Sequence, residues 1–293
     1  MTIAIVVTFK PDFSKLRICL ESLLLQVSFI ILIKNSPERF DIQNLADSQK
    51  IRVIQLDKNY GIAFAQNRGI EKAVELGAEW ILLSDQDSVF SDDYIQKMFF
   101  IAEHNSLQHI AALAPVFYDE IKNEYAGIMQ GKTKKIVPES GHIYKVAHTI
   151  SSGMLIPVTA LQKCGLMRED FFIDFVDNEW CWRAFSCGLN IYCLADVVIH
   201  HHLGDRMEKC LGLNIVYRSL FRFYYIIRNG YYLLRHTEYL KGKDKFLFHL
   251  LMYKKIIEVL LLNHFDKTSR LVVRKAVHNG KKGNLIPYEE SVK

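Results

Sequence analysis

Residues 79–88 read EWILLSDQDS, a run of consecutive apolar residues that ends in an acidic pair, Asp85 and Asp87. Apolar residues in succession, rather than in alternation, indicate a strand covered on both faces by helices, as in a parallel sheet. Residues 3–9 (IAIVVTF) and 28–36 (SFIILIKNS) show the same pattern. This stretch therefore predicts an α/β fold with polar side chains at the strand ends.

The neighbouring segments extend this pattern in both directions. Residues 51–57 and 191–202 predict further strands, whereas residues 15–26 and 62–76 predict helices. Alternation of strands and helices is typical of βαβ units. From residue 214 onward the pattern is helical and lacks a strand rhythm. We therefore expect a sheet domain over residues 1–205 and a helical region over residues 206–293.

Composition excludes several classes of protein. The chain has 293 residues, of which 50% are hydrophobic and 24% charged, so it can bury a large core and is neither disordered nor collagen-like. Its six cysteines form no CxxC pair, which argues against a disulfide framework or zinc finger and favours a reducing, cytosolic setting. No apolar run reaches the ~18 residues of a spanning helix. The short N-terminal run lacks the marks of a signal peptide, so a start at Met1 is expected.

Charge is distributed unevenly along the chain. Residues 1–205 hold 19 Lys and Arg against 25 Asp and Glu, a formal charge of −6. Residues 206–293 hold 18 against 7, a formal charge of +11. This basic region is also rich in Tyr, Phe and Leu. It favours an anionic partner, for which nucleic acid, anionic lipid and a phosphorylated substrate are the candidates.

The acidic pair lies where the carboxyl ends of parallel strands bind ligands. Carboxylates at Asp85 and Asp87 suit Mg²⁺ or Mn²⁺, which a protein commonly holds by one or two carboxylates together with substrate phosphates. The alternative is a turn in which one of the two aspartates caps a following helix.

Residues 59–69 read NYGIAFAQNRG. The small residues let the backbone approach a ligand, and Asn67 and Arg68 offer donors. The alternative is a helix start whose small residues allow close packing.

Residues 168–184 (REDFFIDFVDNEWCWRA) place Asp174, Asp177 and Glu179 among aromatic residues. In a helix, Asp174 and Asp177 would share a face. A carboxylate in a partly apolar cleft is suited to act as a general base. The alternative is a helix whose acids pair with Arg168 and Arg183.

Two further segments admit several interpretations. His200, His201 and His202 follow a predicted strand, and one of them is a candidate metal ligand, although histidines are more often packed or solvent-facing.

Residues 217–235 interleave aromatic residues with arginines. They suit single-stranded nucleic acid, a membrane interface, or packing on the sheet domain. We favour packing with a basic side that faces a membrane.

Taken together, these segments resemble the family-2 glycosyltransferases, and most closely their bacterial rhamnosyltransferase branch. The resemblance covers residues 3–235. It rests on VVTFKP, the N-x-G-x-A-x-A-x-N-x-G pattern of residues 59–69, DQDS, SSGMLIP, FFIDFVDNEWCWR, H-x-x-G and RFYYIIRN. It implies a GT-A fold, which is a Rossmann-like, mostly parallel sheet with helices on both faces. It also implies a nucleotide-sugar donor and an inverting mechanism.

The resemblance also implies roles for individual residues. Asp177 falls at the catalytic base, Asp87 at the Mg²⁺ or Mn²⁺ ion, and Asp85 at the nucleoside. Two departures stand out: Lys34 replaces an acidic residue that contacts the nucleoside, and Val176 replaces a glutamate before Asp177. The expected nucleotide-binding residues are Thr8, Phe9, Lys34, Asn59, Asn67 and Asp85; the expected metal ligands are Asp87 and His201; the expected acceptor or diphosphate contacts are Arg183, Arg222 and Arg228.

The function implied is transfer of a sugar, rhamnose from dTDP-rhamnose, to a lipid-linked saccharide in the synthesis of bacterial O-antigen or capsule. We expect a cytoplasmic enzyme, peripheral at the inner face of the cell membrane, without a nucleic-acid partner. The alternatives are a UDP-sugar donor, a sugar nucleotidyltransferase and a non-catalytic membrane-binding module. A nucleotidyltransferase should carry a glycine-rich loop after its first strand, and residues 8–16 (TFKPDFSKL) contain no glycine.

Overall fold

The computed structural model describes residues 1–41, 48–119, 123–132, 134–201, 207–210 and 212–292. Contacts divide the chain into two compact units. The first comprises Met1–Glu169 and Trp180–Leu203, and the second comprises Asp170–Glu179 and Gly204–Lys293. The second unit thus includes a short segment from the middle of the chain as well as the C-terminal region. The division expected at residue 205 stays a prediction.

The first unit is built on one mixed sheet with the strand order β3-β2-β1-β4-β10-β5-β11-β9, with β6 (Glu124–Tyr125) added beside β5. The strands of this path are β1 (Thr2–Thr8), β2 (Phe29–Lys34), β3 (Ile51–Gln55), β4 (Trp80–Asp85), β5 (Ile110–Asp119), β9 (Ile143–Val146), β10 (Leu155–Pro157) and β11 (Asn190–His201). Neighbours among β1 to β4 pair in parallel, as do β5 and β11. Strand β10 runs antiparallel to β4 and β5. The predicted mostly parallel sheet is therefore confirmed.

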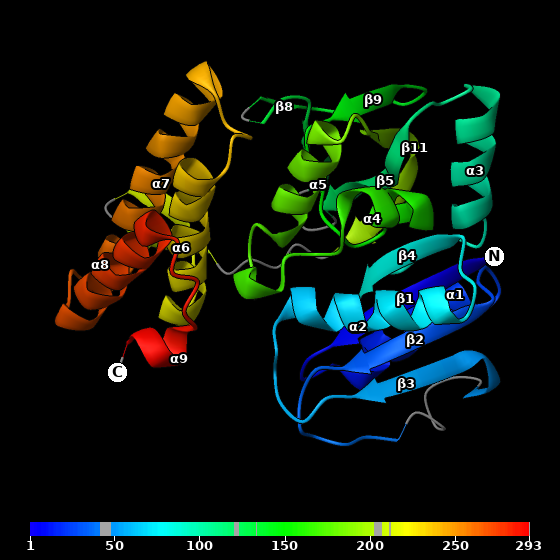
Figure 1. Cartoon of the computed structure of the whole chain (residues 1–293), viewed down its shortest axis with the longest axis horizontal. Helices are drawn as coiled ribbons and strands as arrows, with labels where there is room; N and C mark the ends of the chain where they lie inside the picture. The colour runs from blue at the N-terminus through cyan, green and yellow to red at the C-terminus, as the bar shows by residue number, and fades with distance from the viewer. Residues whose placement is uncertain (42–47, 120–122, 133, 202–206, 211, 293) are drawn as a thin grey trace. The chain divides into compact units, whose positions relative to one another are not determined.

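Helices cover both faces of this sheet. They are α1 (Phe13–Leu24), α2 (Ile62–Glu75), α3 (Tyr94–His104), α4 (Val158–Cys164) and α5 (Val176–Ser186), the last of which begins in the second unit. Helices α1 and α3 share one buried cluster with β1 and β11. Helix α2 packs on the other face and lies in front of the sheet in Figure 1. Gly69 permits this packing, because a Cβ there would lie 2.5 Å from a side-chain carbon of Ile5.

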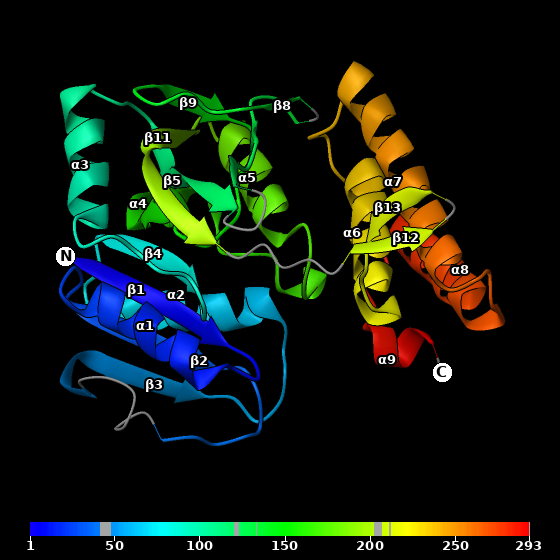
Figure 2. The same ribbon diagram turned by 180° about the vertical axis from the view of Figure 1, so that it is seen from behind.

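The second unit is mainly helical, as predicted. Its helices are α6 (Leu220–His236), α7 (Gly242–Leu262), α8 (Lys267–Lys282) and α9 (Tyr288–Ser291). A hairpin of β12 (Met207–Cys210) and β13 (Leu213–Val216) precedes them, visible in Figure 2, so the expectation of no strand beyond residue 214 was wrong. Helix α6 packs against α7 and α8. Gly280 of α8 meets α6 so closely that a Cβ there would lie 2.3 Å from the carbonyl oxygen of Arg228.

Helix α6 contains most of the aromatic, basic segment of residues 217–235. Its Phe223, Tyr224, Tyr225 and Tyr231 are buried, and so is Arg228. These rings are therefore packed inside the second unit, and the basic side expected to face a membrane does not include Arg228. Packing of the segment on the sheet domain stays a prediction. Within the described part of the chain, no helix is both long enough and apolar enough to cross a membrane.

His148 of the first unit supports the C-terminal half of α5. Trp182 Nε1 donates to His148 Nδ1 at 3.3 Å, and the two rings meet edge to face. Burial lowers the pKa of His148 to about 4. The imidazole is therefore neutral at pH 7, which is the state in which Nδ1 accepts a hydrogen bond.

This burial predicts a pH dependence of stability. Because the folded pKa lies below the ordinary value of 6.5, neutral His148 contributes fully above pH 6.5, and its contribution falls as the pH drops toward 4. The loss should approach about 3 kcal/mol of unfolding free energy. Urea unfolding of wild type and His148→Gln between pH 7.5 and 4.5 measures it. The stabilities of the two proteins should converge as the pH falls, and parallel curves would contradict the assignment.

Candidate active site

The predicted acidic pair lies at the carboxyl end of β4. Asp85 is the last residue of the strand and is half-buried, whereas Asp87 lies in the following turn and is exposed. Strand β4 pairs with β1, so the turn lies beside Phe9, which follows β1. The Phe9 backbone N–H donates to Gln86 Oε1 at 2.8 Å. The two strand ends are thus tied together, with Asp85 and Asp87 on either side of the tie.

Hydrogen bonds from three serines hold the backbone of this turn. The backbone N–H of Asp85 donates to Ser152 Oγ at 3.0 Å, and Ser152 shares a 2.7 Å hydrogen bond with Ser88. Ser84 Oγ donates to the Asp85 carbonyl oxygen at 2.8 Å. These three serines are buried. The SSGMLIP segment therefore acts as the support of the acidic turn, a role that its sequence did not disclose.

Candidate nucleotide residues at the other strand ends differ in exposure. Phe9 is 42% exposed, which leaves its ring accessible to a planar base. Thr8 is buried, and its hydroxyl donates to the carbonyl oxygen of Ile33 at 3.2 Å. Lys34 is also buried: its Nζ donates to the carbonyl oxygen of Phe40 and lies over the ring of that residue. Burial lowers the pKa of Lys34. Of these three, Phe9 is the side chain best placed to meet a nucleoside.

Two asparagines of the 59–69 pattern serve the backbone. Asn59 Oδ1 accepts from Asn35 Nδ2 at 3.1 Å and from the Gly61 N–H at 2.9 Å. Asn67 is buried, and its amide both donates to and accepts from the Met167 backbone at 2.9 Å. These bonds shape the loop that enters α2 and anchor α2 to the chain after α4. The placement of Asn59 and Asn67 therefore favours the packing interpretation of the pattern over direct nucleotide contact.

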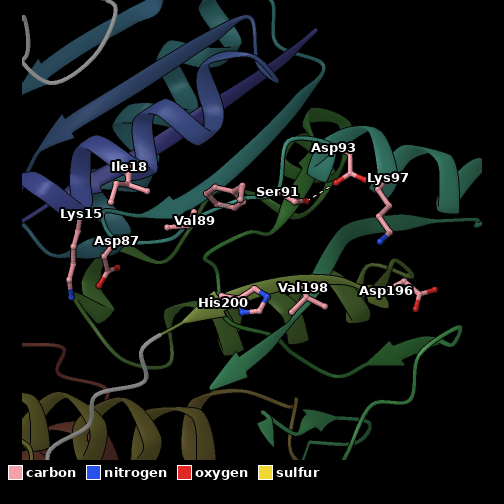
Figure 3. A pocket seen from close by; sticks show the side chains of 11 residues that line it. Lys15, Ile18, Asp87, Val89, Ser91, Asp93, Lys97, Asp196, Val198 and His200 are labelled. Atoms are coloured by element: carbon pink, nitrogen blue, oxygen red, sulfur yellow. Dashed lines mark hydrogen bonds between the residues drawn. The ribbon is translucent and has the colours of Figure 1, made fainter. Parts of the chain in front are cut away.

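A cavity of about 740 Å³ opens beside the acidic turn, and Figure 3 shows its lining. Lys15 and Asp87 lie at one end, Lys97 and Asp196 at the other, and His200 between them (Figure 3). Its size is typical of small-molecule sites. Of the two predicted metal ligands, Asp87 lines it. The side chain of His201 lies outside the described part of the structure, and so does residue 202.

In the second unit, the segment before Asp177 has an unusual backbone. Phe172, Asp174 and Phe175 have φ angles of 66°, 62° and 64°, a left-handed conformation that is costly for residues with side chains. Helix α5 begins only at Val176. Asp174 therefore lies outside the helix, and the condition under which it would share a face with Asp177 is not met. Asp177 lies in the first turn of α5, where its carboxylate accepts from the Asn178 N–H at 2.8 Å.

Asn229 and Arg228 of α6 hold this strained segment. Asn229 Nδ2 donates to the carbonyl oxygens of Phe171 and Ile173 at 3.0 Å and of Asp174 at 2.9 Å. Arg228 Nη2 donates to the carbonyl oxygens of Asp170 at 2.6 Å and Phe171 at 3.1 Å. Both side chains are fully buried. We call this pair the α6 clamp. Its geometry makes Arg228 a support of the segment before Asp177, in place of the expected contact with acceptor or diphosphate.

The other expected arginines are also engaged with protein groups. Arg222 donates to both carboxylate oxygens of Asp174, at 3.2 and 3.1 Å. Arg183 donates to the carbonyl oxygens of Cys164 and Leu166. Glu179, the nearest other carboxylate to Asp177 along α5, is buried and accepts from the hydroxyl of Tyr239 at 3.3 Å. Within the second unit, Asp177 is therefore a better placed carboxylate for an incoming substrate than Glu179.

The acidic turn fits a divalent cation in the kind of donor it offers. Carboxylates at Asp85 and Asp87 are hard oxygen ligands, which Mg²⁺ and Mn²⁺ prefer. Among the described residues, no three His, Cys, Asp or Glu side chains are grouped closely enough to hold a metal by themselves. Such a turn matches a site in which substrate phosphates complete the coordination.

Comparison with known proteins relates this chain to a protein family. The profile of glycosyl transferase family 2 matches residues 3–165. The dTDP-rhamnosyl transferase RfbF of Shigella flexneri is 35% identical over 237 residues, which are 79% of this chain and 79% of that protein.

Solved structures share the fold. S. aureus TarS superposes with a TM-score of 0.60 at 14% identity over 98% of this chain and 49% of that chain. A shorter TarS structure, residues 1–349 with UDP-GlcNAc, gives 0.55 at 14% identity over 99% of this chain and 90% of that one. GalNAc-T7 with UDP, GalNAc and Mn²⁺ gives 0.56 at 12% identity over 90% and 58%. The matched profile, which covers more than half of the chain, and the identity to RfbF together show that this protein belongs to glycosyl transferase family 2.

Proposed function

We propose that the protein is an inverting rhamnosyltransferase that uses dTDP-rhamnose and a saccharide acceptor. The observation that carries this proposal is the 35% identity to a dTDP-rhamnosyl transferase over 79% of both chains. The acidic turn after β4 and the carboxylate of Asp177 supply groups that such a reaction requires. Exposed Phe9 gives a surface on which the thymine ring can stack.

In the proposed reaction, Asp177 removes the proton from an acceptor hydroxyl while the oxygen attacks the anomeric carbon of the donor. The bond from that carbon to the diphosphate breaks and the nucleoside diphosphate leaves. The sugar is then bonded to the acceptor oxygen, with the configuration at its anomeric carbon inverted. The α6 clamp keeps the backbone before Asp177 in a conformation that it would not adopt alone.

Asp87, assisted by His201, would hold Mg²⁺ or Mn²⁺, with Asp85 toward the nucleoside. When bound, the ion neutralises charge on the departing diphosphate. The turn itself contributes two carboxylates, and Ser152 and Ser84 fix the backbone of Asp85.

The acceptor is proposed to be a lipid-linked saccharide of bacterial surface-polysaccharide synthesis, such as O-antigen or capsule. The enzyme would then work at the inner face of the cell membrane. Support comes from the formal charge of +11 on residues 206–293, which attracts anionic lipid.

A UDP-sugar donor is the second candidate, because a structure that shares this fold was solved with UDP-GlcNAc. Release of nucleoside diphosphate from dTDP-rhamnose and from UDP-GlcNAc, each with and without EDTA, tests the proposal. Faster release from dTDP-rhamnose supports it. Faster release from UDP-GlcNAc favours the second candidate, and no release from either would leave a non-catalytic binding module.

Replacing Asp177 by Asn should abolish transfer and leave donor binding nearly intact. The amide keeps the shape of the side chain but cannot accept the proton, and loss of a general base typically lowers kcat by about 10²- to 10⁴-fold. Initial rates with acceptor, and dTDP affinity from thermal shift, measure the two effects. A variant that retains more than about a tenth of wild-type kcat would exclude Asp177 as the base.

Replacing Asp87 by Ala should remove both activity and dependence on metal, whereas Asp85→Ala should mainly weaken nucleotide binding. The two effects differ because one carboxylate is proposed on the cation and the other on the nucleoside. Metal titrations of activity and dTDP affinity separate them, with Asp92→Ala as a control on the same loop. Equal, metal-independent losses in both variants would identify the pair as a structural turn.

Replacing Asn229 by Ala should lower kcat with little change in dTDP affinity, because three carbonyl oxygens before Asp177 lose their donor. The unfolding free energy should also fall, by about 1–3 kcal/mol. Asn279→Ala is the matched control: its buried amide lies in the same unit but donates to Tyr224 and Ser291 rather than to the carbonyl oxygens before Asp177. If both variants lose equal stability and equal kcat, the clamp has no specific role in positioning Asp177.

A further inference from the structure

Helix α7 exposes a line of large apolar side chains. Phe246, Leu250, Tyr253 and Ile257 are 63%, 48%, 56% and 54% exposed. Their spacing of four, three and four residues places them within an arc of about 60° on the helix, over a length of about 16 Å. We call these four residues the α7 stripe. A contiguous apolar surface of this kind on a water-exposed helix marks an interaction site.

The stripe is not needed to hold α7 in place. The opposite side of the helix is buried through Phe248, Met252 and Val259. Met252 packs against α6 at Gly230, where a Cβ would overlap its sulfur atom. Helix α7 is therefore anchored by one face and presents a second apolar face outward.

Exposed lysines lie to either side of the stripe. By helical spacing, Lys243 and Lys254 lie within about 40° of one edge of the stripe, whereas Lys245 lies about 80° beyond the other edge. All three are exposed. The surrounding region of residues 206–293 carries a formal charge of +11. A second copy of the chain would bring like charges together, whereas an anionic lipid surface offers opposite charge at the flanks and acyl chains for the stripe.

We propose that α7 lies in the interface of an anionic membrane, with the α7 stripe among the acyl chains and the bordering lysines at the headgroups. This inference rests on the proposed function, since it gives the site by which the enzyme reaches a lipid-linked acceptor. Lysine stems can extend along the apolar surface while their ammonium groups stay in water. Aromatic Tyr253, with its polar hydroxyl, suits the same boundary.

Co-sedimentation with vesicles of phosphatidylglycerol and phosphatidylcholine tests the proposal. Leu250→Gln/Ile257→Gln should weaken binding to anionic vesicles about tenfold or more, because two side chains no longer enter the apolar layer. The matched control is Phe100→Gln/Phe185→Gln, which removes two apolar side chains that are 64% and 62% exposed in the first unit. The control should bind like wild type. Equal binding by wild type and the stripe variant would overturn the proposal.

Salt separates the two components of binding. Lys243→Gln/Lys245→Gln/Lys254→Gln should lose most of its binding at low salt, whereas the stripe variant should lose the fraction that persists near 1 M salt, where the Debye length is about 3 Å. Tyr253→Trp adds a direct readout. Brominated acyl chains should quench the introduced indole, and wild type, in which Trp80 is half-buried and Trp180 and Trp182 are buried, gives the reference signal. An unquenched indole would place the stripe outside the membrane.

Two further measurements distinguish the possible failures. The exposed α7 stripe has no part in the proposed release of dTDP from dTDP-rhamnose in solution, so the stripe variant should keep wild-type rates while its vesicle binding falls. If wild type released no dTDP from dTDP-rhamnose, that result would instead contradict the proposed function. Sedimentation velocity gives the oligomeric state: a wild-type dimer that the stripe variant breaks, without vesicle binding, would assign the stripe to a second copy.

Discussion

A buried polar backbone group must find a hydrogen-bond partner, and this constraint shapes every part of the candidate site. A parallel sheet whose strands end together brings many such groups to one edge, and asparagine, with two donors and an acceptor, can satisfy several of them. Asn35 and Asn59 order the entry to α2, and Asn67 joins α2 to the chain at Met167. In the second unit, Asn229 does the same for three carbonyl oxygens. The polar residues of the sequence patterns thus mostly build the frame, and the proposed substrate contacts reduce to a small number of carboxylates and one exposed ring.

The sequence predicted the fold well because its signals are local. Consecutive apolar residues in β1, β2 and β4 indicated a sheet covered on both faces, and the two early helices begin and end within two residues of their predicted bounds. The hairpin β12–β13 escaped prediction because its strands have four residues each, too few for a period to emerge. The backbone around Asp174 escaped for another reason. Its left-handed conformation depends on donors from α6, about 55 residues later in the chain, which no local pattern encodes.

Site residues were predictable by type more than by role. Paired aspartates after a buried strand indicated the acidic turn, and the structure places them there beside Phe9. Residue type alone did not separate ligand contacts from internal supports, so Arg228 and Asn67 were assigned to substrate although both are buried. No sequence pattern indicated that the serines support the acidic turn. Their role depends on how β10 brings Ser152 beneath β4, which is a property of the sheet order.

The left-handed turn before Asp177 affects how the activity of the protein should respond to temperature. Each such residue costs of order 1–3 kcal/mol and persists only while its surroundings enforce it. Since the enforcing groups are side chains of α6, loosening of the helical unit while the sheet stays folded would release the turn. Transferase activity should therefore be lost on warming at a temperature below that of cooperative unfolding, and brief cooling should restore the activity. Thermal inactivation and thermal denaturation would then be two separate events, with the clamp setting the first and the sheet core setting the second.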